Sequence, residues 1–305
     1  MSKRVKVCFS KLLFKITKLA IVLTVLYIYF TPTILSRNTD SLQHVFPHRN
    51  RNSQINLVIA HPDDEVMFFS PVISQLHAYF PDTVPFNILC LSKGDAEGLG
   101  ETRAKELNDS AVLLLRNERP VSVQVVDFED GMDEVWDIDS ITSTLSQTID
   151  VNNEKVSQII VTFDSYGVSN HINHKSCHIA VEKFIDDYVR SKGKENAENA
   201  ENAHITALYL RSYKNNFFLK YNFFIWEILK MLYRTVSPFG KSIQPLAPST
   251  TTEKNGLLLM NTHSQYILAF AAMLNAHKSQ VVWFRYGWWL LSRFVFVNEF
   301  DIFTY

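Results

Sequence analysis

The sequence predicts an α/β fold in which a parallel β-sheet carries helices on both faces, preceded by one N-terminal transmembrane helix. Short apolar runs alternate along the chain with segments whose apolar residues recur at helical spacing. The apolar runs are continuous, as expected of strands that are buried on both faces. Strand and helix follow one another in the order that is typical of βαβ units.

Four strands and four helices account for the first part of this pattern. The predicted strands cover residues 55–60, 86–92, 121–128 and 158–163. The predicted helices cover residues 63–80, with a kink at Pro71, and then 101–116, 139–150 and 171–190. Ligands of such sheets bind beyond the carboxyl ends of the strands. We therefore expect the chemistry in the segments that follow the strands.

The N-terminal segment is typical of a membrane anchor. Residues 1–18 form a basic tail with six Lys or Arg and no acidic residue, and residues 19–36 are uncharged. No small-x-small cleavage site follows the apolar run, which favours an uncleaved transmembrane helix over a signal peptide. Residues 37–53 are polar and predict a linker, so we expect the catalytic domain at residues 54–305.

The bulk composition excludes some classes of function. Outside the basic tail the chain has 24 basic and 31 acidic residues, which does not suggest a nucleic-acid partner. Cys8, Cys90 and Cys177 lie too far apart for a disulfide framework. Residues 191–203 contain the repeat "ENAENAENA", which predicts a low-complexity surface insert.

The stretch "AHPDDE" directly follows the first predicted strand. His61 and Asp64 are three residues apart at a strand-to-helix turn, which can direct both side chains to one point. Acidic residues also stabilise a helix N-terminus, but that explanation leaves the histidine and three consecutive carboxylates unexplained. Asp63 and Glu65 are both candidates for a general base by proximity alone.

A histidine cluster, "HINHKSCH", follows the fourth predicted strand. His171, His174 and His178 fall on one helical stripe. Catalytic zinc usually has three protein ligands and one open position. His61, Asp64 and either His174 or His178 would complete such a site, and the spacing leaves that choice open. The chemistry expected of it is metal-assisted hydrolysis of a carbonyl compound.

Taken with "GDAEGLGETRAKEL" between them, these two motifs resemble the PIG-L/LmbE-type zinc de-N-acetylases. The resemblance covers about residues 54–300 and implies a Rossmann-like (LmbE-like) fold. It implies that His61, Asp64 and His174 are the metal ligands, that Asp63 is the general base, and that His171 stabilises the tetrahedral intermediate or acts as an acid. Glu65 then supports the helix, and His178 is structural.

The resemblance also implies a substrate and a place. The anchor and the C-terminal aromatic segment resemble family members that deacetylate the glycolipid N-acetylglucosaminyl-phosphatidylinositol, the second step of glycosylphosphatidylinositol-anchor synthesis. It implies a single-pass protein of the endoplasmic reticulum membrane with a cytosolic catalytic domain. The six basic residues before the span favour instead a catalytic domain in the lumen.

Residues 217–236 and 281–297 are candidate membrane-facing segments. The substrate-binding candidates are Arg103, Asp95, Asp130, Arg285 and Arg293, the last two for the phosphate.

Two positions depart from the family pattern. Some relatives have Asp where Asn173 stands, so the group that orients His171 is open, with Asp164 as one candidate. Asn170 replaces a frequent Gly, and Asn also tolerates left-handed backbone angles.

Three alternatives remain at this stage. One is a zinc deacetylase of the same fold that acts on a soluble amino-sugar conjugate, and another is a membrane-anchored glycosyltransferase. The third is a tethered interaction domain without catalytic activity.

Overall fold

The computed structural model describes residues 3–47, 52–153, 155–192, 204–214, 216–221, 225–236 and 256–305, with side chains from residue 11 onward. Most of the predicted surface insert, 193–203, lies outside these residues.

The body is built on a seven-stranded sheet with the order β3-β2-β1-β4-β5-β7-β6. All four strands predicted from the sequence are present, and they pair in parallel with β5 alongside β4. The strands are β1 (Ser53–Ile59), β2 (Phe86–Cys90), β3 (Val121–Val125), β4 (Ser157–Phe163), β5 (Ile205–Leu210), β6 (Gly256–Met260) and β7 (Val297–Thr304).

The sheet is mixed, because β7 runs antiparallel to both of its neighbours, β5 and β6. The expectation of a parallel sheet therefore holds for β1–β5 and not for the C-terminal edge. The chain between β6 and β7 contains two helices, at residues 263–275 and 283–291, and returns to the sheet with β7 antiparallel to β6.

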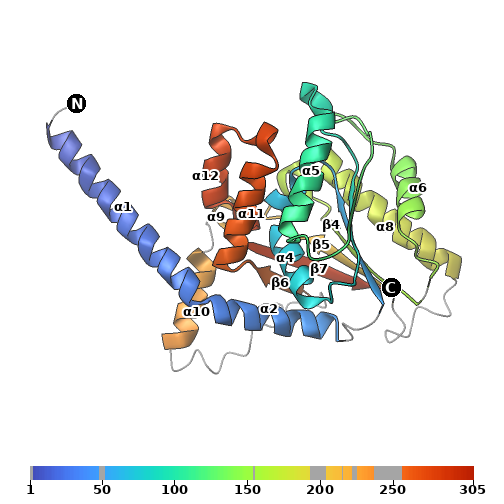
Figure 1. The fold of residues 1–305 in the computed structure, drawn as a ribbon, viewed down its shortest axis with the longest axis horizontal. Coiled ribbons are helices and arrows are strands. Elements are labelled where there is room, and N and C mark those ends of the chain that lie inside the picture. The colour runs from blue at the N-terminus through green and yellow to red at the C-terminus, as the bar shows by residue number, and fades with distance from the viewer. Residues whose placement is uncertain are drawn as a thin grey trace.

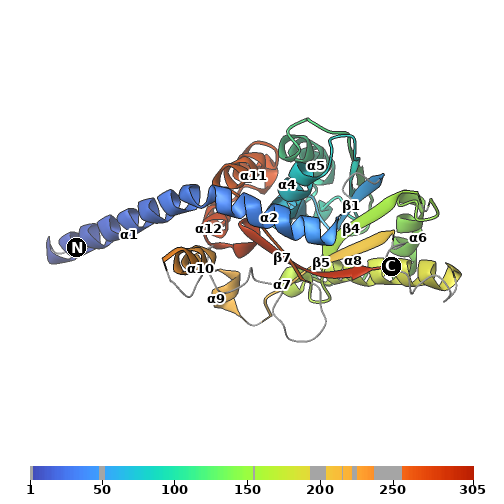
Figure 2. The same ribbon diagram turned by 90° about the horizontal axis from the view of Figure 1, so that it is seen from below.

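Helices cover both faces of the sheet (Figures 1 and 2). Helices α2, α4, α5 and α11 lie on one face, and α6 and α8 lie on the other. The helices are α1 (Lys3–Tyr29), α2 (Thr31–Val45), α3 (Asp64–Met67), α4 (Ser70–Tyr79), α5 (Gly100–Leu114), α6 (Ile138–Thr148), α7 (Gly167–Asn170), α8 (Ile172–Lys192), α9 (Phe217–Lys220), α10 (Ile225–Val236), α11 (His263–Asn275) and α12 (Trp283–Leu291), with 3-10 turns η1 (Asp95–Glu97), η4 (Lys278–Gln280) and η5 (Arg293–Val295).

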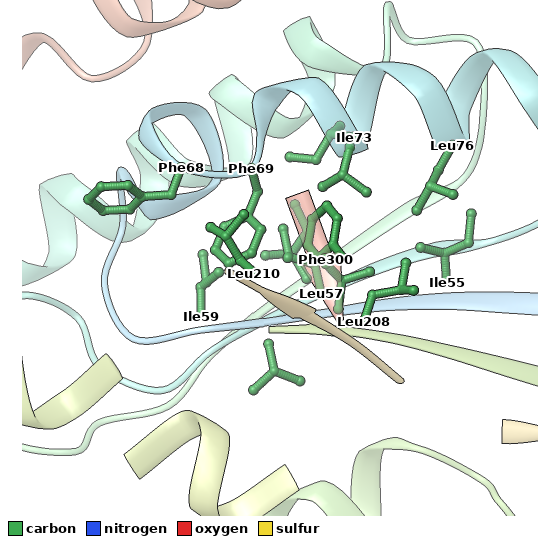
Figure 3. Packing of buried hydrophobic residues seen from close by; sticks show 14 of the residues in the cluster. Ile55, Leu57, Ile59, Phe68, Phe69, Ile73, Leu76, Leu208, Leu210 and Phe300 are labelled. Atoms are coloured by element: carbon green, nitrogen blue, oxygen red, sulfur yellow. The ribbon is translucent and has the colours of Figure 1, made fainter. Parts of the chain in front are cut away.

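The predicted helix 63–80 is divided into α3 and α4, and Pro71 stands in the first turn of α4, where a missing N–H costs nothing. The core beneath it joins α4 to the middle strands (Figure 3). Phe69, Ile73 and Leu76 pack over β1 and β5, and all three are fully or almost fully buried. This packing fixes the turn between β1 and α3, from which the site is built.

The anchor and the linker differ from the sequence prediction. The helix that is long and apolar enough to cross a membrane runs from Lys11 to Tyr29, and only 6% of it is buried in the protein. The predicted span, 19–36, ends too late, because Phe30 and Ile34 are buried against the body. Residues 31–45, which overlap the predicted linker 37–53, form α2 instead. This helix begins at Thr31, has Pro32 in its first turn and packs along β6.

Helix α2 is tied to β6 by one buried side chain. The amide of Asn38 donates to the carbonyl oxygen of Met260 at 2.8 Å and accepts from its N–H at 3.0 Å. We expect Asn38→Ala to cost about 1–3 kcal/mol, because the Met260 N–H loses its partner inside the protein. Thermal unfolding of the purified full chain would then occur at a lower Tm.

Ser36→Ala is the matched control, because the exposed Ser36 hydroxyl makes only a long 3.5 Å contact with Asp40 on the same helix. If the Asn38→Ala and Ser36→Ala proteins have the same Tm, the contact between α2 and β6 does not stabilise the fold, and α2 behaves as the linker that the sequence predicted.

Candidate metal-dependent hydrolase site

The site lies at the carboxyl ends of the parallel strands, as the sequence predicts. The turn after β1 supplies His61 to Asp64, and the segment after β4 supplies His171 and His174. Asp130 comes from the loop after β3. These residues come from three separate stretches of chain, which the parallel order of β3, β1 and β4 places at one edge.

His61, Asp64 and His174 form a buried cluster whose ligand atoms all lie within 4.8 Å of one another. The Nε2 atom of His174 is 3.3 Å from Oδ1 of Asp64, and Nδ1 of His61 is 3.7 Å from Oδ2. Oδ2 also accepts the N–H groups of Ala60 and His61, which fixes the carboxylate. The structure thus brings His61, Asp64 and His174 together. His178 instead pairs with Glu182 on α8.

The hydrogen bonds of the two histidines fit a metal site. Nδ1 of His174 lies 3.0 Å from the carbonyl oxygen of Gly167, which can only accept, so Nδ1 carries the proton and Nε2 offers a lone pair. Nε2 of His61 faces two acceptors, Oδ1 of Asp130 at 3.0 Å and Oδ1 of Asn173 at 3.2 Å, so Nε2 carries a proton. In both rings the other nitrogen faces Asp64, the pattern expected of histidine ligands with their supporting partners.

The charges of the cluster favour a cation. Burial lowers the pKa of His61, but hydrogen bonds to Asp130 and Asp64 outweigh it and raise that pKa to about 10. Burial raises the pKa of Asp64, but His174 and His61 hold it below its usual range. Binding of a divalent ion would therefore be coupled to release of a proton from this site.

Asp63 has an unusual backbone conformation. Its φ is 119°, in the left-handed region that residues with side chains rarely adopt. The Asp63 N–H donates to Oε2 of Glu65 at 3.1 Å, and the preceding carbonyl, of Pro62, accepts from Arg103 at 2.9 Å. The turn separates two consecutive carboxylates, because Asp64 faces the histidines while Asp63 faces arginines.

Glu65 holds this turn from inside the protein. Its Oε1 accepts the Ser110 hydroxyl at 2.6 Å and lies 2.6 Å from Nε2 of His277, and both Glu65 and His277 are fully buried. Burial lowers the pKa of His277, but the Glu65 carboxylate outweighs it and raises that pKa. This confirms a supporting position for Glu65. His277 was missed by the sequence analysis, because it lies 212 residues away in a stretch with no motif.

Arginine side chains surround the Asp63 carboxylate. Arg285 of α12 pairs with it at 2.8 Å, and Arg103 of α5 lies at 3.9 Å. Burial raises the pKa of Asp63, and the positive charge of Arg285 partly opposes this shift. Arg103 also donates to the carbonyl oxygen of Gly94 at 2.7 Å, so it braces two of the loops at this edge.

His171 is held by backbone, and not by a charged group. Its Nδ1 accepts the N–H of Asn173 at 3.3 Å, so its proton lies on Nε2. Burial, together with the neighbouring His174 and His61, lowers the pKa of His171 to about 4. The hypothesis that Asp164 orients His171 is wrong, because the Asp164 carboxylate accepts hydrogen bonds from Ser212 and from nearby backbone N–H groups. Asn170 has a φ of 66°, as its tolerance of left-handed angles suggested.

Two other candidates lie apart from this cluster. Arg293 does not face solvent, because it is 2% exposed and pairs with Glu227 and Glu299, so the expectation that it meets a substrate phosphate is wrong. Asp95 is exposed, and its carboxylate accepts the Gly100 N–H at 2.6 Å at the start of α5.

Comparisons with known proteins agree with this geometry. A family model described as PIG-L, GlcNAc-PI de-N-acetylase, matches residues 56–185. The N-acetylglucosaminyl-phosphatidylinositol de-N-acetylase of Saccharomyces cerevisiae is 72% identical over 305 residues, which cover 100% of this chain and 99% of that protein. The chain belongs to this family. Relatives with the same name in Arthroderma benhamiae and Bos taurus are each 31% identical, over 94% and 81% of this chain and 97% and 82% of their own lengths.

Membership of the PIG-L family confirms the resemblance and the α/β fold expected from the motifs. It also gives the chain its chemistry, because enzymes of this family are de-N-acetylases. The chain is a hydrolase of amide bonds, and its His and Asp cluster is suited to hold a metal ion.

Gly167 allows the close approach of His174. Its φ is 65°, and a Cβ at this position would lie 2.8 Å from Cβ of His174. We expect Gly167→Ala to displace the His174 ring and to lower the metal content of the purified protein, as measured by plasma emission spectrometry after dialysis.

Gly98→Ala is a matched control, because Gly98 also has a positive φ, 73°, but has no atom within 4 Å of the added Cβ. Equal metal retention in the two variants would contradict the role given to Gly167.

The buried pair of Glu65 and His277 can be measured by a double-mutant cycle. We expect His277→Ala to cost about 3–5 kcal/mol of unfolding free energy, because it leaves a buried carboxylate without its cation. The combination with Glu65→Gln should cost clearly less than the sum of the two single changes. Additive effects in chemical unfolding would show that the two side chains do not support each other.

Proposed function

We propose that this chain hydrolyses the N-acetyl group of N-acetylglucosaminyl-phosphatidylinositol to give glucosaminyl-phosphatidylinositol and acetate. One observation carries the proposal: Asp63 stands beside an assembled His61, Asp64 and His174 cluster. The chain that holds it is 72% identical, along its whole length, to a relative named for this activity. The reaction is the second step of glycosylphosphatidylinositol-anchor synthesis.

His61, Asp64 and His174 would hold a divalent ion, with zinc as the metal that best suits two imidazoles and one carboxylate. When bound, such an ion supplies a Lewis acid for the amide carbonyl and lowers the pKa of a nearby water. Nδ1 of His61, after loss of its proton, and Nε2 of His174 are the nitrogens that would face it. Asp130 and Gly167 keep the other nitrogens protonated.

Asp63 accepts the proton of the attacking water in this mechanism. Arg285 and Arg103 keep its carboxylate in place beside the cluster. His171 presents an N–H at Nε2, because its Nδ1 accepts from Asn173. That N–H can donate to the oxyanion of the tetrahedral intermediate or pass a proton to the departing amine.

The remaining candidates give the proposed substrate contacts. Asp95 and Asp130 stand on the segments after β2 and β3, and Arg103 stands in the first turn of α5, where all three can meet sugar hydroxyl groups. The side chain of Arg285 is 18% exposed on α12, so it can meet the lipid phosphate at its outer edge. We place the enzyme in the endoplasmic reticulum membrane with α1 as its single span and the body on the cytosolic side.

Replacing the base tests the mechanism. We expect Asp63→Asn to lower kcat for acetate release from N-acetylglucosaminyl-phosphatidylinositol by about 10²–10⁴, the usual contribution of a general base, while the metal content stays unchanged. Asn keeps the shape of the side chain and tolerates the left-handed backbone.

Asp133→Asn, on the exposed part of the loop after β3, is the control and should keep full activity. Unchanged turnover in Asp63→Asn would exclude Asp63 as the base. Equal kcat/KM on a lipid-free N-acetylglucosaminyl-inositol phosphate would favour a deacetylase of soluble conjugates.

A further inference from the structure

Helix α10 exposes large apolar side chains. They recur at spacings of three and four residues and form one stripe: Trp226, Leu229, Tyr233 and Val236. The buried side carries Ile228 and Met231 together with a charged residue, Glu227, which pairs with Arg293 in the interior. An amphipathic helix on a water-facing surface would expose polar side chains at the positions of this stripe.

Helices α9 and α12 expose large apolar side chains in the same way. The most exposed are Phe218 of α9, at 82%, and Trp283 of α12, at 85%. Others on these two helices are Phe217, Phe284, Tyr286, Leu290 and Leu291. Helix α6, on the other side of the body, buries Ile141 and Leu145 and exposes mainly polar positions. The exposed apolar residues therefore gather on the part of the body that carries α9, α10 and α12.

This part of the body surrounds the end of α1. Figures 1 and 2 show α1 leaving the body beside α10, and α1 contacts both α10 and α11. No spacer separates the span from the body, because the Tyr27 hydroxyl donates to the carbonyl oxygen of Asn261 and Phe30 is buried. The 19 residues from Lys11 to Tyr29 rise about 28 Å, roughly the hydrocarbon thickness of a bilayer. A bilayer crossed by α1 must then begin at the surface of the body.

We propose that α9, α10 and α12 form a docking surface that lies in the interfacial layer of the bilayer that α1 crosses. The inference rests on the membrane anchoring given under the proposed function. Trp and Tyr side chains favour the headgroup level, and the apolar stripe of α10 would lie against the acyl boundary. The partner is thus a lipid surface, and neither a second copy of the chain nor another protein.

The charges of this region favour anionic lipids. Helices α9 and α10 carry three basic residues, Lys220, Lys230 and Arg234, and one acidic residue, Glu227, in the part that the structure describes. The Glu227 side chain is buried and pairs with Arg293 and Lys230. Basic side chains near a membrane surface are attracted to lipids with negative headgroups, such as phosphatidylinositol.

The docking surface reaches the candidate site through two side chains. Arg285 extends from α12 to the Asp63 carboxylate. Lys220 extends from α9 and donates to the carbonyl oxygen of Val168, three residues before His171, at 3.3 Å. The two helices that would lie on the lipid therefore each contact one wall of the site. A headgroup that stays in the bilayer could enter the site from this edge.

Site-directed spin labelling of the full chain in lipid nanodiscs tests the surface. Labels are placed at Trp226→Cys and Trp283→Cys in a Cys8→Ser background, since Cys90 and Cys177 are buried. Discs contain phosphatidylcholine with phosphatidylinositol. The control is Ile179→Cys on α8, an apolar residue that is 48% exposed on a different face. Phe218→Cys and Leu290→Cys replace any variant that does not fold.

For each label we compare the collision rate with oxygen, which dissolves in lipid, to the collision rate with a water-soluble nickel chelate. We expect the ratio of oxygen to nickel collisions to be several-fold higher at the docking surface than at residue 179. An equal ratio at all positions would place the helices in water and overturn the proposal. Low accessibility to both reagents would mean that protein covers them, and would overturn it too. The measurement uses no substrate, so retained acetate release by water-exposed variants would leave the proposed function intact.

Discussion

The site depends on the hydrogen bond by which buried Glu65 holds Asp63 in a left-handed conformation. Such a backbone costs about 1–3 kcal/mol and persists only where its surroundings fix it. Here Ser110 and His277 fix the Glu65 carboxylate from the other side. The strained turn lets two consecutive carboxylates take different tasks, with Asp64 facing the histidines and Asp63 facing the arginines.

The same turn explains how three adjacent acids are tolerated. Glu65 has a buried imidazole partner, Asp63 has the guanidinium of Arg285, and Asp64 accepts two backbone N–H groups and lies beside two histidines. Each carboxylate is thus stabilised by a different element of the fold. A bound cation would offset the negative charge of Asp64, which the Nδ1 of His61 and the Nε2 of His174 face. The repulsion among the carboxylates of Asp63, Asp64 and Glu65 is therefore offset by contacts with residues far away in the sequence.

Local pattern allowed much of this to be predicted. Continuous apolar runs predicted β1 to β4. The rule that ligands bind beyond parallel strands placed His61 and Asp64 near the histidine cluster, and the family resemblance then favoured His174 over His178. What failed depended on tertiary contacts. Periodicity cannot show that α2 docks on β6 through Asn38, nor that β7 reverses direction. Arg293 looked like a surface residue in an aromatic stretch, but its partners, Glu227 and Glu299, come from other elements.

The division of labour between Asp63 and Asp64 is tested most directly by an experimental structure of the full chain loaded with zinc, with anomalous scattering measured at the zinc edge. The account predicts one peak about 2.0–2.2 Å from Nδ1 of His61, Nε2 of His174 and an oxygen of Asp64, with the Asp63 carboxylate outside bonding distance. A peak bonded to Asp63, or one held by His61, Asp130 and His171 in place of this set, would contradict it.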